Sequence, residues 1–310
     1  MNRDDKVQAR SVRFGSIRAP SVEAWGRHGR LELGSEGILR PGKFGWLRSI
    51  AWMIALLVAL IFVISLQSIV RSIFPNPQVT LAMAFVCTAL AYASYYFLVR
   101  WGEHRIPGEL SLRNFPVDYL VGLLAGGSLV LIVMGVLWGC GAYQIRPDQW
   151  TDWQHDLRET IGTGLLEELL VRLVVFRLLS RAFGIPAGLL ISAAAFGAAH
   201  LMNPNATISA AVAIAVEAGL LLAGFYFTSG RIWMSVGAHT AWNLTLGGVF
   251  GASVSGMTSA GSLLHSAPVP GSSVILTGAT FGPEASLPAI ILGFAMFLIT
   301  LWLAPATPRN

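Results

Sequence analysis

GTGLLEELLVRLVVFRLLSR, residues 162–181, places two adjacent carboxylates inside a run that is otherwise long and apolar enough to cross a membrane. The free energy of inserting an ionised carboxylate near the centre of a bilayer is unfavourable by about 2.5–3.5 kcal/mol on insertion scales. An acidic residue at that depth is therefore interpreted first as a functional residue. On a helix, Glu168 and Arg172 lie on one face, whereas Glu167 points about a quarter-turn away. We therefore expect Glu168 to pair with Arg172 and Glu167 to face a cavity.

The composition of the whole chain is that of a membrane protein. Of its 310 residues, 54% are hydrophobic and only 12% are charged, and the mean hydropathy is +0.63. The net charge of +5 could indicate a nucleic-acid partner, but ten of the 21 Lys and Arg residues precede residue 50. They form a basic tail ahead of the first apolar segment, so we expect membrane lipid, and no nucleic acid, as a partner.

Hydropathy predicts an all-α fold, a polytopic membrane bundle of about eight transmembrane helices. A bilayer core needs about 20 apolar residues per helix, and Pro-rich and Gly-rich breaks separate the candidates. The predicted helices are residues 46–70, 79–99, 117–138, 157–181, 185–203, 206–228, 231–250 and 284–305.

Three regions follow from these helices. Residues 1–45 are predicted to be a disordered basic tail, residues 46–156 the N-terminal transmembrane helices, and residues 157–305 the core that carries the two carboxylates. Sixteen basic residues then lie on the side of the N-terminus and three on the other, so both termini are expected in the cytoplasm. The Ala- and Gly-rich composition suggests a bacterial multi-pass protein of the cell membrane. The loop of residues 251–283 is long enough to fold back over the bundle.

Further polar residues occur at helical spacing in two other predicted spans. Phe196 and His200 are four residues apart in ISAAAFGAAH, where the small residues allow close helix packing. His239 and Asn243 are also four residues apart, in SVGAHTAWN. We expect these residues to meet the carboxylates of the first stretch at a similar depth.

This set of side chains can perform hydrolysis in two ways. A carboxylate and an imidazole can activate a water molecule while a second imidazole and a carboxamide stabilise an oxyanion. Alternatively, Glu and His can bind a divalent metal such as Zn²⁺, which lowers the pKa of bound water. Residue types alone leave both open. Glu217 is a further buried acid, and Cys87 and Cys140 have neither disulfide nor zinc-ligand spacing.

EELLVR (residues 167–172), FGAAH (196–200) and HTAWN (239–243) resemble the motifs EExxxR, FxxxH and HxxxN of the CPBP family of intramembrane proteases. That family includes the Rce1-type CAAX prenyl endopeptidases and the bacterial Abi, or bacteriocin self-immunity, proteins. The resemblance covers about residues 157–290. Three motifs in order on successive helices are specific, although no single one is decisive.

The resemblance implies a helical bundle with a glutamate-dependent peptidase site that opens towards the cytoplasm. By position, Glu167 is the general base, His200 holds the water with it, and His239 with Asn243 forms the oxyanion hole. The remaining motif residues, Glu168, Arg172 and Phe196, support the site. Family members are commonly named metalloproteases, although a metal-free mechanism is also proposed, so a divalent metal stays an open cofactor.

The leading prediction is thus an endopeptidase that hydrolyses a membrane-associated or lipidated, CAAX-like, peptide or protein. One alternative is a membrane scaffold or immunity protein that keeps the motif residues as a polar core without proteolysis. A proton-coupled transporter is a third, but the sequence has no corresponding halves of the kind that inverted repeats produce.

Overall fold

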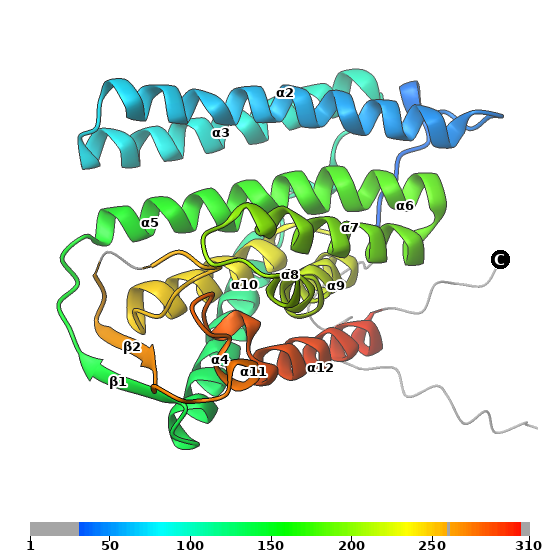
Figure 1. The fold of residues 1–310 in the computed structure, drawn as a ribbon. Helices are drawn as coiled ribbons and strands as arrows, with labels where there is room; N and C mark the ends of the chain where they lie inside the picture. Colours follow the sequence, from blue (N-terminus) through cyan, green and yellow to red (C-terminus); the bar gives the residue numbers. More distant parts are fainter. Residues whose placement is uncertain (1–30, 259–260, 305–310) are drawn as a thin grey trace, which may run out of the picture.

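The computed structural model describes residues 31–258 and 261–304, and these form a bundle of helices with one two-stranded sheet (Figure 1). This confirms the predicted helical class. The first half contains η1 (Gly37–Leu39), α2 (Gly45–Ile73), α3 (Pro77–Gly102), η2 (Gly108–Leu110), α4 (Phe115–Gly139), β1 (Tyr143–Pro147), α5 (Trp153–Ile161), η3 (Gly162–Glu167), η4 (Leu169–Phe176) and α6 (Arg177–Phe183). The second half contains α7 (Ile185–Ala199), η5 (His200–Met202), α8 (Ile208–Ile214), η6 (Ala215–Leu220), α9 (Leu221–Ser229), α10 (Trp233–Asn243), η7 (Leu244–Val249), β2 (Leu264–Pro268), α11 (Val274–Thr277), η8 (Pro283–Ala285) and α12 (Leu287–Leu303).

All eight predicted spans are helical, and among the described residues five helices are long and apolar enough to cross a membrane. These five are Gly45–Ile73, Pro77–Gly102, Phe115–Gly139, Ile185–Met202 and Ile208–Ser229. Of the other three predicted spans, the run from Trp153 to Phe183 carries several charges. The span at residues 231–250 is made of α10 and η7, which have 11 and 6 residues, and α12 has 17 residues. The apolar residues that α2 exposes provide a surface for lipid.

Local sequence explains where several helices begin and end. The Asn76 side chain caps the start of α3, with Pro77 in the first turn, and Ser286 caps α12 in the same way. Gly184 has a φ of 88° and allows α6 to turn directly into α7. The short connection makes these two helices an antiparallel hairpin.

Helices α4 and α10 pack with their backbones in close contact. A Cβ atom at Gly126 would overlap the carbonyl oxygen of Ala238, and one at Gly237 would overlap that of Tyr119. Helices approach this closely only where the interface residues are small. The pairing fixes α10, and with it His239, against the centre of the bundle.

The structure describes the last part of the predicted N-terminal tail, residues 31–44. Residues 31–44 lie against the bundle, with Leu39 buried and its carbonyl oxygen accepting a hydrogen bond of 2.8 Å from Arg181. Arg181 also donates to the carbonyl oxygen of Gly34 at 2.9 Å. These contacts join segments far apart in sequence, so composition could not reveal them. Residues 1–30 of the predicted tail lie outside the described residues.

The loop after η7 does return to the bundle, but as a sheet that the sequence did not predict. β2 pairs antiparallel with β1, which lies between α4 and α5, and the register places Ile145 opposite Ser266. Both strands lie at one end of the bundle, at the left of Figure 1, whereas the chain leaves α12 at the other end.

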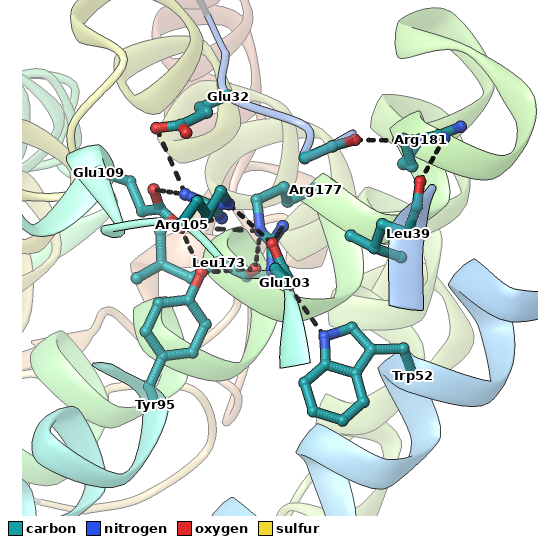
Figure 2. A network of polar contacts seen from close by, with 11 residues as sticks. Glu32, Leu39, Trp52, Tyr95, Glu103, Arg105, Glu109, Leu173, Arg177 and Arg181 are labelled. Atoms are coloured by element: carbon teal, nitrogen blue, oxygen red, sulfur yellow. Dashed lines mark hydrogen bonds and ion pairs between the residues drawn. The ribbon is translucent and has the colours of Figure 1, made fainter. Parts of the chain in front are cut away.

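A buried ionic network joins four segments at the end opposite the sheet (Figure 2). Arg177 of α6 is fully buried and makes two hydrogen bonds to Glu103, of 2.7 and 2.9 Å, and Trp52 of α2 donates to the same carboxylate at 3.0 Å. Arg105 bridges Glu103, at 2.7 Å, and Glu109, at 2.8 Å. Each buried charge thus has an opposite charge and further hydrogen bonds, which buried ions require.

The carboxyl group of Glu109 lies in this network and outside the membrane-spanning helices. Burial alone would raise its pKa, but hydrogen bonds from Arg105 and the charges of Arg177 and Arg105 outweigh burial and lower the pKa of Glu109. Glu109 therefore stays ionised in the folded protein, and its charge contributes to stability.

Candidate active site

The two carboxylates lie near the middle of one continuous helical run from Trp153 to Phe183. Two parts of the run, η3 and η4, have the wide turns of a π-helix, and Glu168 lies between them. π-helical turns are rare and occur mostly at functional sites. The run therefore departs from regular α-helix at the point where its acidic residues lie.

Glu168 is the centre of a fully buried hydrogen-bond network. Its Oε2 accepts a hydrogen bond of 3.0 Å from Nε of Arg172, which confirms the predicted pair. Ser235 of α10 donates to the same oxygen, and Nδ1 of His239 lies 3.0 Å from Oε1. With partners on both oxygens, Glu168 holds α10 in place and is not available to a ligand.

Glu167 has the opposite environment, as its position on the helix predicts. Its side chain is 34% exposed, lines a cavity, and lies 4.0 Å from Nε2 of His239. Because Nδ1 of His239 is held by Glu168, the ring turns its other nitrogen towards Glu167. The carboxylate and the imidazole therefore face the same space.

His200 ends α7 and lines the same cavity. Its Nδ1 lies 2.8 Å from the carbonyl oxygen of Phe196, and since a carbonyl can only accept, this nitrogen carries the proton. In a neutral ring, Nε2 then has a free lone pair. The Phe196 ring packs edge-on against both His200 and His239, and the Arg172 guanidinium lies 4.9 Å from its centroid. Phe196 thus orients three members of the site.

Asn243 lies one helical turn beyond His239, and its carboxamide donates to the Thr163 hydroxyl at 2.7 Å. Close helix packing makes this contact possible, because a Cβ atom at Gly164 would lie 2.5 Å from Oγ1 of Thr240. One N–H of the carboxamide is used by Thr163, which leaves the other to the cavity.

The cavity has a volume of about 500 Å³, which falls in the range of ligand pockets in proteins. Glu167, His200, His239 and Asn243 line its inner part. Its outer part is lined by the N-terminal turns of the α5–η3 run, by the loop between η5 and α8, and by residues 254–258. The cavity therefore opens at the end of the bundle that carries the sheet.

A second, smaller void of about 20 Å³ lies behind the first, and both are lined by His200, His239 and Asn243. Its volume suffices for about one water molecule. Glu217 and Glu284 also line it, and one oxygen of Glu217 has no hydrogen-bond partner among the described residues. Glu284 belongs to η8, which folds inward and buries it, and Trp242 donates to its carboxylate at 3.0 Å.

The donor set does not fit a zinc ion. Catalytic zinc takes three protein ligands as a rule. Within residues 31–258 and 261–304, no group of three or more His, Cys, Asp and Glu side chains is arranged to hold a metal. Glu168 is already occupied by Arg172, Ser235 and His239.

Residues 149–245 match the sequence model of one protein family, described as type II CAAX prenyl endopeptidase Rce1-like. Searches of curated proteins and of solved structures found no match. Residues 149–245 of this helical membrane protein are thus similar to an Rce1-like domain of the CPBP family, and this match confirms the resemblance of the three motifs. All three lie within the matched residues.

The structure brings the four predicted cavity residues together and places the predicted supporting residues, Glu168, Arg172 and Phe196, behind them. Sequence reasoning missed Ser235 and Thr163. Ser235 lies four residues before His239, so helical spacing could have revealed it. Thr163 gave no such signal, since its partner Asn243 is distant in sequence.

Proposed function

We propose that the protein is an intramembrane endopeptidase that hydrolyses a peptide bond of a membrane-associated or lipidated substrate with a water molecule activated by Glu167. The observation that carries the proposal is the convergence of Glu167, His200, His239 and Asn243 on one cavity within an Rce1-like domain. The family's description names CAAX prenyl endopeptidases. By extension, we propose a CAAX-like substrate for this protein.

In the proposed reaction, Glu167 takes a proton from water as the resulting hydroxide attacks the scissile carbonyl carbon. The lone pair on Nε2 of His200 accepts the second O–H of that water and orients it. Glu168 stabilises a protonated His239, whose Nε2–H donates with the Asn243 amide to the oxyanion. When the C–N bond breaks, Glu167 returns its proton to the leaving amine, so the carboxylate is regenerated.

The proposed setting is the cell membrane of a bacterium, with both termini in the cytoplasm. The basis is the excess of Lys and Arg at the end of the bundle that carries residue 31 and the end of α12. Membrane lipid surrounds the apolar helices, and the substrate is a peptide or protein.

Cleavage of a quenched fluorescent peptide library, prenylated and unprenylated, by purified protein in detergent tests the proposal. We expect Glu167→Gln to lower the rate by about 10²–10⁴-fold, the usual contribution of a general base. Glu36→Gln is the matched control, because Glu36 is an exposed carboxylate outside the cavity, and it is expected to cleave like wild type.

A chelator added in parallel tests the metal-free mechanism, which predicts no loss of cleavage. Equal cleavage by wild type and Glu167→Gln would contradict the assigned role of Glu167. A Glu167→Gln protein that keeps its function in the host would instead support the scaffold or immunity alternative.

A further inference from the structure

The mouth of the cavity lies at one end of the bundle only. Its exposed residues, which we call the cavity mouth, are Glu159, Pro204, Asn205, Met257 and Thr258. They belong to the start of the helical run that carries Glu167 and to two loops on the side of the sheet. On the helical run, the lining positions proceed from His155 through Thr163 to Glu167, so the path from the mouth to the carboxylate runs inward from this end.

Both described ends of the chain lie at the opposite end of the bundle. Glu32 forms an ion pair with Arg105, at 3.3 Å, in the connection between α3 and α4. Thr300, near the end of α12, accepts a hydrogen bond of 3.0 Å from Thr228, near the end of α9. The ends of α3, α6, α9 and α12 therefore meet at this pole (Figure 1).

Basic residues are divided unequally between the two poles. The pole of the chain ends carries Arg40, Lys43, Arg48, Arg100, Arg105, Arg113, Arg181 and Arg231 among the described residues. The pole of the cavity mouth carries Arg71, Arg146 and Arg158, of which Arg158 is paired with Glu159 at 2.7 Å. Short loops rich in Lys and Arg stay in the cytoplasm, so this asymmetry orients the bundle.

We infer that the cavity opens on the non-cytoplasmic side of the membrane, opposite to the access that the family resemblance implies. The cytoplasmic pole and the cavity mouth cannot be the same surface, because the helical run from Trp153 to Phe183 separates them. At a rise of about 1.5 Å per residue, that run is about 46 Å long, which exceeds the thickness of a bilayer core.

The side on which the cavity opens also defines the class of substrate, an inference that rests on the proposed function. The substrate is a membrane-anchored polypeptide whose scissile segment lies on the non-cytoplasmic side, next to the anchor. A protein prenylated and retained in the cytoplasm has no access to this mouth.

Labelling of single cysteines in intact cells tests the orientation without any assay of activity. In a Cys140→Ser background, which leaves only the buried Cys87, one variant carries Asp148→Cys at the pole of the mouth. The matched variant carries Arg113→Cys, at an exposed position of the opposite pole. We expect a membrane-impermeant maleimide to label Asp148→Cys in intact spheroplasts and to label Arg113→Cys only after permeabilisation.

The reverse pattern, with Arg113→Cys labelled in intact spheroplasts and Asp148→Cys protected, would overturn the inference. Labelling of both proteins after denaturation confirms that each is present. This readout does not depend on cleavage. Failure of the proposed function, in which Glu167→Gln cleaves like wild type, is therefore distinguishable from failure of the orientation. Active protein with reversed labelling would overturn only the access side.

Discussion

Ser235 lies at the junction of two helices, with its hydroxyl against Glu168 and also 2.9 Å from the carbonyl oxygen of Leu222. Neither partner lines the cavity, so the effect of Ser235 is on the position of Glu168 and, through Glu168, on His239. Glu168 keeps Arg172 and His239 when the hydroxyl is removed.

We expect Ser235→Ala to lower kcat by about tenfold with little change in KM, because a hydrogen bond to a charged group contributes about 1.5–3 kcal/mol. Ser192→Ala is the matched control, since the Ser192 hydroxyl is also buried in a helix but donates only to the carbonyl oxygen of Leu189. Steady-state kinetics with a peptide from the library measure both. An increase in KM alone would assign Ser235 to substrate binding instead.

At the scale of elements, the contact of α4 with α10 sets the distance between the two sides of the site. We expect Gly126→Ala to destabilise the protein by about 1–3 kcal/mol, because the new methyl group meets the Ala238 backbone, which cannot rotate away. Gly135→Ala, on the same helix, is the matched control, with nothing within 4 Å of the new Cβ atom. Thermal unfolding in detergent compares the two. Because Ala favours helix more than Gly does, Gly135→Ala should not be destabilising, and equal changes in both variants would show that packing at Gly126 does not decide the effect.

The sequence predicted the elements of the bundle better than it predicted their contacts. Apolar runs of helical length predicted every span, and i, i+4 spacing predicted the pair of Glu168 with Arg172. The sheet, the burial of Glu284 and the docking of residues 31–44 were missed, since each depends on a partner more than 40 residues away. Periodicity reports only local neighbours.

At the scale of the whole molecule, the ionic network around Glu103 and Glu109 joins α2, α3 and α6 (Figure 2). The folded pKa of Glu109 lies below its ordinary value of 4.5, so ionised Glu109 stabilises the fold above that value, and the stabilisation is lost as pH falls through the folded pKa. We expect the unfolding temperature in detergent to fall as pH decreases from about 6 to about 3.

Glu109→Gln tests this pH dependence, because it removes the titrating group but keeps a side chain of the same shape. The variant is expected to be less stable at neutral pH and to show a weaker decrease on acidification. Unfolding temperatures of wild type and variant that decrease in parallel would assign the acid sensitivity to other carboxylates.

The ionic network also limits axial sliding of the helix that carries the site. Arg177 follows Glu167 by ten residues on the same helical run, or about 15 Å along its axis. A translation of one turn, about 5.4 Å, would separate Arg177 from Glu103 and would carry Glu167 away from His239. The depth of the Glu167 carboxylate in the membrane is thus fixed by the ion pair of Arg177 with Glu103, at the other end of the same helical run. Neither residue of this pair lines the cavity.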